Sequence, residues 1–229
     1  MYNPIKPTLK TEIIPFLLLI FTFALSFYFY NNFPETVPVH WNLKGEADNF
    51  GPRWVAAILM PMVILFLYIM FLVLPLLDPR KKRYKQFTKT YHVIKISLVF
   101  FMFIVYLISG FKILGYNIPI EVWMPSMVGI LFMVLGNYIS KIKNNWFVGI
   151  RTPWTLSSEE VWNKTHRLAG KIFVIGGLVM ISIQFISASL QMTVFFIMIA
   201  TMVLVPIVYS YLIYLKNENE KHKNNQQSK

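Results

Sequence analysis

Six long apolar segments restrict this chain to a membrane. Each has roughly the 20 residues that a helix needs to cross the hydrocarbon core of a bilayer. A water-soluble protein of 229 residues could not bury a chain that is 56% hydrophobic. We therefore predict an all-α integral membrane protein with six transmembrane helices. The predicted segments are 13–30, 55–77, 93–114, 120–139, 168–190 and 192–215.

The third segment has the shortest uncharged stretch, 16 residues from 96 to 111. This stretch spans about 24 Å at about 1.5 Å per residue. We expect Lys95 and Lys112, at its two ends, to snorkel outward and complete the crossing.

The positions of the positive charges predict the orientation, because loops rich in Lys and Arg stay in the cytoplasm. With the N-terminus and the C-terminus cytoplasmic, 19 of the 22 Lys and Arg residues lie inside. Only Lys44, Arg53 and Lys112 then lie outside. The first apolar run is long and lacks a clean cleavage site, so we interpret it as an uncleaved helix rather than a signal peptide.

The loops divide the chain into three parts. We predict a two-helix membrane domain (1–90) with an external loop (31–54), a four-helix membrane domain (91–215), and a disordered polar tail (216–229). The net charge of +12 follows from the topology, because the basic stretch 80–89 anchors two helices to anionic lipid. A docking surface for a cytoplasmic partner is the alternative use of this stretch. We expect no direct nucleic-acid binding.

No recognisable catalytic or metal-binding motif accompanies the apolar segments. None has Asp, Glu, His or Arg near its centre, and we place the four histidines, His40, His92, His166 and His222, in different loops. We therefore expect no catalytic residue, metal or cofactor. A peptidase-like enzyme using His40 or His166 and a small-molecule transporter are the alternatives.

Small and polar residues on the fourth and fifth segments predict helix packing, with a groove for an apolar peptide as the alternative. These residues are Gly129, Met133, Gly136, Gly177, Gln184, Ser187 and Gln191.

The external loop has a pattern of its own. Apolar and polar residues alternate strictly over 37–43, as in a short half-buried strand, and Gly45 and residues 49–52 predict turns. The structural alternative is a lid on the helix ends, with Trp41 at the level of the lipid headgroups.

The inner loop is expected to be folded at the membrane interface. Three tryptophans recur every eight residues, as Trp146, Trp154 and Trp162. Thr152 precedes Pro153 and is therefore extended, so we expect 149–154 to be non-helical. The residues from Ser157 to Glu160 predict a capping box that starts a helix, with Glu160 and Lys164 paired on its surface.

Both loops resemble a known family. Residues 38–51, "PVHWNLKGEADNFG", are similar to the His-Trp-Asn-x-x-Gly-x-x-Asp loop of an uncharacterised membrane domain commonly found ahead of SdpI-type proteins. Residues 136–173 are similar to the signature region of the SdpI family of bacterial membrane immunity proteins. The external matches are His40, Trp41, Asn42, Gly45 and Asp48. The internal matches are Gly136, Asn137, Lys143, Asn145, Trp146, Gly149, Arg151, Thr152, Pro153, Trp154, Thr155, Ser157, Trp162, His166 and Gly170.

The resemblance implies a function at the bacterial plasma membrane. SdpI-type proteins protect a producing cell from its own secreted toxic peptide. The resemblance also implies a receptor role, in which toxin bound outside leads to capture of a cytoplasmic repressor at the membrane. We expect the external matches to form the ligand-facing site, with Trp41 as apolar anchor and His40 and Asn42 as polar partners.

Arg151 is our candidate for the functional centre of the inner loop. Its planar guanidinium suits a bidentate contact to a lipid phosphate, to Glu159 or Glu160, or to a carboxylate of a partner. The alternative is that Arg151 is one more cation that sets the topology.

The topology is testable with epitope tags. A tag near residue 48 is expected to be accessible in intact cells, whereas tags near residue 85 and at the C-terminus should be reached only after permeabilisation. Antibody labelling of whole and permeabilised cells measures this. A C-terminal tag labelled in intact cells would contradict the six-helix topology.

Overall fold

The computed structural model describes residues 4–42 and 44–227. In this part of the chain, six helices are long and apolar enough to cross a membrane, as predicted. The long helices are α1 (Leu9–Asn32), α2 (Met60–Leu77), α3 (Thr88–Ile113), α4 (Ile120–Ile139), α6 (Glu159–Ser182) and α7 (Ala188–Gln227). The shorter elements are β1 (Thr36–Trp41), β2 (Ala47–Pro52), the π-helical turn η1 (Val55–Leu59), the 3-10 turns η2 (Lys81–Gln86) and η3 (Ile183–Phe185), and α5 (Pro153–Ser157).

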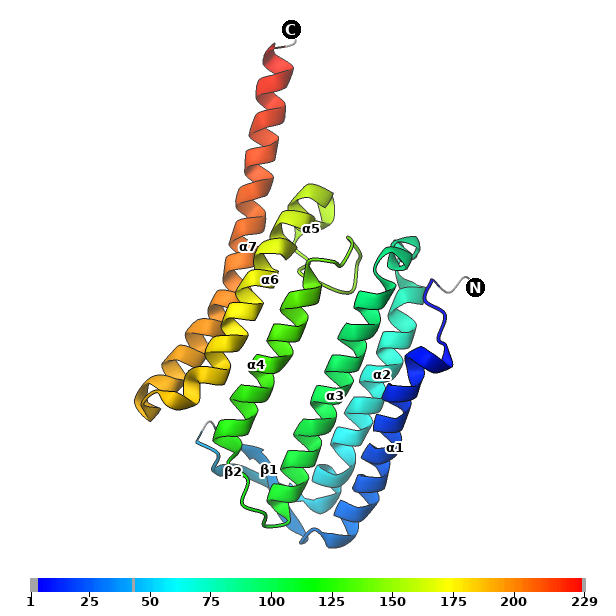
Figure 1. Ribbon diagram of the computed structural model, residues 1–229, viewed down its shortest axis with the longest axis vertical. Helices are drawn as coiled ribbons and strands as arrows, with labels where there is room; N and C mark the ends of the chain where they lie inside the picture. The colour runs from blue at the N-terminus through cyan, green and yellow to red at the C-terminus, as the bar shows by residue number, and fades with distance from the viewer. Residues whose placement is uncertain (1–3, 43, 228–229) are drawn as a thin grey trace.

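The long helices stand side by side in chain order (Figure 1). α1 and α2 pack on α3, α4 lies between α3 and α6, and α7 packs on α6. The β1–β2 hairpin lies at one end of the bundle, which we call the hairpin end; α5 and the inner loop lie at the opposite end, the loop end (Figure 1). The predicted all-α, multi-pass architecture is therefore confirmed.

The external loop is a β-hairpin. β1 and β2 pair antiparallel, from Thr36 opposite Pro52 to Trp41 opposite Ala47, with irregular register on both sides of His40. The predicted strand is present as far as Trp41, and Leu43 lies outside the described residues. Gly45 forms the turn with a positive φ of 75°. The second predicted turn, at 49–52, is wrong: those residues belong to β2, because pairing with β1 overrides their turn propensity.

A π-helical turn joins the hairpin to α2. Its wider hydrogen-bond pattern leaves room for side chains to reach the backbone. The Ser26 hydroxyl of α1 and the Tyr106 hydroxyl of α3 both donate to the Ala57 carbonyl oxygen, each at 2.8 Å. The first three transmembrane helices are thereby tied together at the hairpin end.

Close glycine contacts join α4 to α6. A Cβ atom added to Gly129 would lie 2.5 Å from the Gly177 carbonyl oxygen, and one added to Gly136 would lie 2.7 Å from that of Gly170. The predicted packing role of these small residues is thus correct. The predicted series of small and polar residues does not continue along one helix, because α6 ends at Ser182. Gln184 lies in η3 and Gln191 in α7.

The polar tail is helical where it is described. The sequence predicted disorder for 216–229, but α7 continues to Gln227. Lys216 pairs with Glu220 at 3.8 Å and Lys221 with Glu218 at 2.8 Å, and Asn217 donates to Glu160 of α6 at 3.0 Å. The residues of each Lys–Glu pair lie one turn apart within α7. Pairs of this kind stabilise a helix whose earlier turns have already formed in the membrane.

Lys95 does not snorkel, contrary to our expectation. Its side chain is 1% exposed, and its Nζ lies 2.6 Å from both carboxylate oxygens of Glu12 in α1. The Tyr68 hydroxyl of α2 donates to the same carboxylate at 2.9 Å. The snorkelling rule failed because a carboxylate from a neighbouring helix is within reach of the ammonium group, so the charge is neutralised inside the bundle.

We predict that Lys95→Met destabilises the protein by about 3 kcal/mol, because it leaves the partly buried Glu12 carboxylate without its cation. Denaturant unfolding of the purified protein in detergent measures the loss. Lys112→Met, at the other end of α3, is the control and should change stability little. Adding Glu12→Gln to Lys95→Met should restore most of the lost stability; no recovery in this double variant would disprove the paired-charge explanation.

Candidate functional site

A buried carboxylate organises the loop end. Asp78 follows α2 directly and is 1% exposed. One of its oxygens accepts the Arg80 N–H at 2.6 Å, and the other accepts the Tyr84 hydroxyl and the Trp146 N–H, each at 2.9 Å. Burial, and then the Asp78 carboxylate beside it, raise the pKa of the Tyr84 hydroxyl far above its usual value. Tyr84 therefore remains a hydrogen-bond donor to Asp78.

Arg80 extends this network across the loop. Its guanidinium donates to the Asn144 side-chain oxygen and, at 3.2 Å, to the Leu156 carbonyl oxygen. It also lies over the Trp146 ring, 5.7 Å from the centroid. Asn144 in turn donates to the Thr155 carbonyl oxygen at 2.9 Å. One arginine thus connects the end of α2 to both sides of the inner loop.

Asn145 shapes the loop from within. Its side-chain oxygen accepts the backbone N–H groups of Phe147 and Val148, at 2.9 and 2.7 Å. Its amide group donates to the carbonyl oxygens of Lys143 and Val148, at 2.8 and 2.9 Å. The side chain is fully buried, so these internal hydrogen bonds take the place of hydrogen bonds to water.

His166 is a buried structural histidine. Its Nε2 accepts the Ile150 N–H at 3.0 Å, so its Nδ1 carries the proton that is donated to the Trp162 carbonyl oxygen at 2.8 Å. The ring stacks on Trp162 with centroids 4.0 Å apart. Gly149 has a φ of 114°, and a Cβ there would lie 2.5 Å from Nε2. Glycine is therefore required for the loop to cover this ring.

The loop ends in a short helix that the sequence did not predict. Thr152 is extended, as expected before a proline, but α5 begins at Pro153, so the expected absence of helix over 149–154 is wrong at its end. Thr152 and Thr155 cap each other reciprocally, and the Thr152 hydroxyl also contacts that of Ser210 in α7 at 3.0 Å. A proline in the first turn leaves no hydrogen bond unmade.

The predicted capping box at Ser157 is also wrong. The N-cap of α6 is Ser158, whose hydroxyl accepts the Val161 N–H at 3.3 Å. Ser157 instead ends α5. The predicted pair of Glu160 and Lys164 is present at 2.6 Å.

Arg151 does not contact either predicted glutamate. Its guanidinium donates to the Trp146 carbonyl oxygen at 2.6 Å and is otherwise exposed. Glu159 pairs with Arg83, and Glu160 with Lys164. These acids are therefore occupied, and a phosphate or a partner's carboxylate remains as our hypothesis for the free face of Arg151.

The remaining inner residues lie in different places. Trp162 is buried and donates to the Ile142 carbonyl oxygen at 2.8 Å, whereas Trp154 contacts the Tyr211 ring of α7. Lys143 is exposed and lines a polar cavity of about 170 Å³ with Arg83 and Glu159. Asn137 lies apart from the network, exposed in the last turn of α4.

The external candidates separate into three roles. His40 Nδ1 lies 2.6 Å from Asp48, and both side chains are largely exposed. Asn42 shapes the turn, because its oxygen accepts the N–H groups of Lys44 and Glu46, at 2.9 and 3.1 Å. Trp41 alone of the five candidates lines a cavity of about 200 Å³ under the hairpin.

This cavity is mainly apolar, and its walls come from the hairpin, η1, the first residue of α2 and the end of α3. It is the part of the hairpin end that can receive an apolar side chain. The lining residues are Pro38, Val39, Trp41, Val55, Ala56, Leu59, Met60, Tyr106, Ser109, Gly110 and Ile113.

Asp78, Arg80 and Tyr84 were not predicted from the sequence as members of a site. Asp78 is an acid at the end of an apolar run and just before a proline, which is a detectable signal, but the basic stretch after it was interpreted as a topology anchor or a docking surface. His92 and His166 are also not in loops; they lie within α3 and α6. In the part of the chain that the structure describes, no three potential metal ligands gather.

The comparisons with known proteins agree with this architecture. Residues 141–210 match the SdpI/YfhL protein family, and residues 17–65 match a domain of unknown function, DUF1648. The chain is 26% identical over 208 residues to the immunity protein SdpI of Bacillus subtilis (strain 168), covering 91% of this chain and 98% of that protein. No solved structure gives a significant match.

Six apolar helices and these matches indicate a multi-pass bacterial membrane protein, with a folded loop at one end of the bundle and a β-hairpin at the other. The chain is similar to the SdpI family, through the match over residues 141–210 and the 26% identity to an immunity protein of that name. The Asp78 network starts between the two matched regions of the chain, and Asp78 and Tyr84 contact residues within 141–210.

We predict that Asp78→Asn destabilises the protein by about 1–3 kcal/mol. The side-chain NH2 of asparagine is a donor, and in this buried site it would point at another donor, either a backbone N–H or the Tyr84 hydroxyl. Thermal unfolding in detergent and protease sensitivity of the inner loop both report the change. The control is Glu159→Gln, which removes an exposed ion pair and should change stability by less than about 1 kcal/mol. Equal effects of the two substitutions would show that the network does not organise the loop.

Proposed function

We propose that this protein confers immunity to a secreted toxic peptide at the bacterial plasma membrane. The observation that carries the proposal is the similarity to an immunity protein over 91% of this chain and 98% of the relative. The extent of the match includes both the hairpin and the inner loop. It therefore covers the external and the internal surfaces that such a protein would use.

The ligand-facing site of this proposal is the cavity beside Trp41. A toxic peptide that enters membranes carries apolar side chains, and the cavity presents apolar walls at the hairpin end. His40 and Asp48 lie exposed on the same hairpin and provide polar contacts at its outer face. Asn42 and Gly45 contribute by holding the turn, not by contacting the ligand.

The proposal extends to a receptor role at the loop end. Arg151, Lys143 and Trp146 are exposed there and form a cationic, aromatic surface suited to an acidic partner such as a cytoplasmic repressor. The hydrogen bonds of Asp78 connect this surface to the end of α2, whose start lines the external cavity. A signal would travel along α2 as a shift between two arrangements of these contacts.

An enzyme is less well supported. Both ring nitrogens of His166 are engaged by the backbone, so this histidine has no free base to offer. His40 is oriented by Asp48, but among the described residues no hydroxyl forms a hydrogen bond with it. The buried Lys95 is neutralised by Glu12, an arrangement that supports packing without implying transport.

The immunity proposal is tested by expressing the protein in a sensitive bacterium and challenging the cells with concentrated culture supernatant of its own host. We expect the parent protein to preserve survival and membrane potential. Trp41→Ala should weaken toxin binding by about 2 kcal/mol or more, which is about thirty-fold or more, if Trp41 is the central anchor. Survival curves against supernatant dilution measure this shift.

The matched control is Phe50→Ala, because Phe50 is an exposed aromatic residue of the same hairpin that does not line the cavity. Immunoblots of the membrane fraction establish equal amounts of each variant. Full protection by Trp41→Ala would refute the cavity as the toxin site. Absence of protection by the parent protein would refute the immunity function itself.

A further inference from the structure

A groove runs along the seam between α4 and α6 near the loop end. It has a volume of about 460 Å³ and is open to the outside of the bundle. Its floor exists because Gly136 and Gly170 allow the two backbones to meet; a Cβ on Gly170 would lie 2.8 Å from the Gly136 carbonyl oxygen. The lining residues are Gly136, Asn137, Ser140, Arg167, Gly170, Lys171, Val174 and Ile175.

The groove lies where the outer surface of the bundle changes from apolar to polar. The exposed residues of α6 lie along one face of the helix. Arg167 and Lys171 are nearer the loop end, whereas Ile175 and Leu178, which are 60% and 50% exposed, are nearer the hairpin end. α4 shows the same change from Ile130, which is 49% exposed, to the polar exposed positions that begin at Asn137. Since exposed apolar side chains of a membrane-spanning helix face lipid, this boundary marks the headgroup level.

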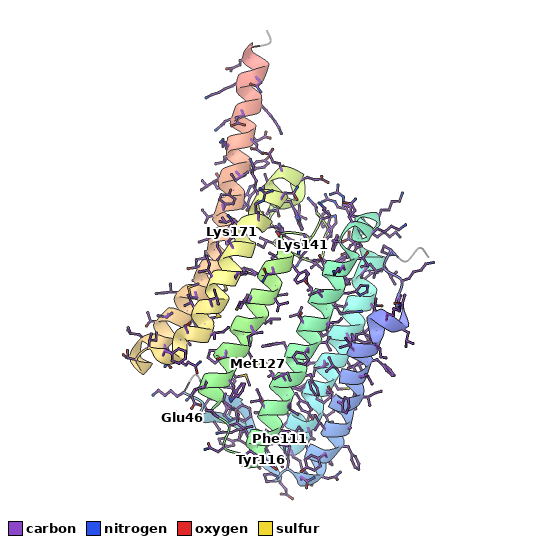
Figure 2. All side chains as sticks on the ribbon, in the orientation of Figure 1. Glu46, Phe111, Tyr116, Met127, Lys141 and Lys171 are labelled. Atoms are coloured by element: carbon purple, nitrogen blue, oxygen red, sulfur yellow. The ribbon has the colours of Figure 1, made fainter. Side chains whose placement is uncertain are left out.

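Two cations of the groove have no counter-ion among the residues that the structure describes. Arg167 and Lys171 are one helical turn apart and exposed, and the described residues offer neither of them a carboxylate. None of the described residues that line the groove is acidic. By contrast, Lys164 on the same helix is paired with Glu160. Figure 2 shows Lys171 and Lys141 at the same end of the bundle.

We propose that this groove binds one anionic phospholipid. Arg167 and Lys171 hold its phosphate, with the Ser140 hydroxyl and the Asn137 amide as polar neighbours. An acyl chain lies along Val174 and Ile175 toward the centre of the membrane. A free phosphate has the same anionic group, but the groove continues into an exposed apolar face, which favours a ligand with a hydrocarbon tail. The site does not depend on the immunity function.

Native mass spectrometry tests this proposal. The purified full-length protein is mixed in detergent with dioleoyl phosphatidylglycerol or with dioleoyl phosphatidylcholine, and the retained lipid is counted. We expect one phosphatidylglycerol per chain to be retained in preference to phosphatidylcholine. The double variant Arg167→Gln/Lys171→Gln should bind phosphatidylglycerol about thirty-fold more weakly, which corresponds to about 1 kcal/mol for each cation at a membrane surface.

The charge-matched control is Lys6→Gln/Lys10→Gln, which removes two exposed cations beside the start of α1, at the same end of the bundle but away from the groove. It should retain lipid like the parent protein; equal loss in both double variants would mean general attraction to charge and overturn the site. Lys171→Arg keeps the cation and should retain the lipid, which distinguishes phosphate binding from damage to α6. Thermal unfolding checks that each variant is folded.

An added solution of inorganic phosphate distinguishes the two sources of the phosphate group. Failure of millimolar phosphate to displace phosphatidylglycerol supports a lipid site. Complete displacement, or equal retention of phosphatidylcholine, would overturn the proposal.

Discussion

The buried carboxylate of Asp78 is the interaction on which the loop end depends. It ends α2, holds the following turn through the Arg80 N–H, and holds the inner loop through Tyr84 and the Trp146 N–H. A buried charged group without partners is strongly unfavourable, whereas three converging donors compensate for its lost hydration. The carboxylate therefore fixes the end of α2 against the inner loop, although the two segments are far apart in the chain. The surface at the loop end depends on this arrangement.

The helices pack through different contacts in the two halves of the bundle. Between α1, α2 and α3, polar groups cross the helix contacts: Lys95 meets Glu12, and two hydroxyls meet the Ala57 carbonyl oxygen. Between α4 and α6, glycines allow backbone contact without polar bonds. In lipid, where helices gain little from burying apolar surface, both close packing and internal hydrogen bonds stabilise association. The glycine seam has a second consequence, since it opens the groove that presents Arg167 and Lys171.

Several features were predictable from the sequence because they depend on local composition. The six transmembrane helices follow from hydropathy, the turn at Gly45 from glycine, and the pair of Glu160 and Lys164 from their spacing of four residues. Local rules failed where two signals competed within a few residues. The sequence predicted the start of α6 at Ser157, but Ser157 ends α5 and Ser158 is the N-cap of α6.

The sequence by itself determined that this chain crosses a membrane six times, and it indicated which two loops carry information. Only the tertiary structure decided the partners of the buried polar groups. Lys95 and Glu12 are 83 residues apart, and Asp78 and the Trp146 N–H are 68 residues apart. Hydropathy and capping patterns report on each segment and its neighbours, but the partner of a buried charge depends on which helices pack together. That choice is made by the shape and polarity of whole helix surfaces.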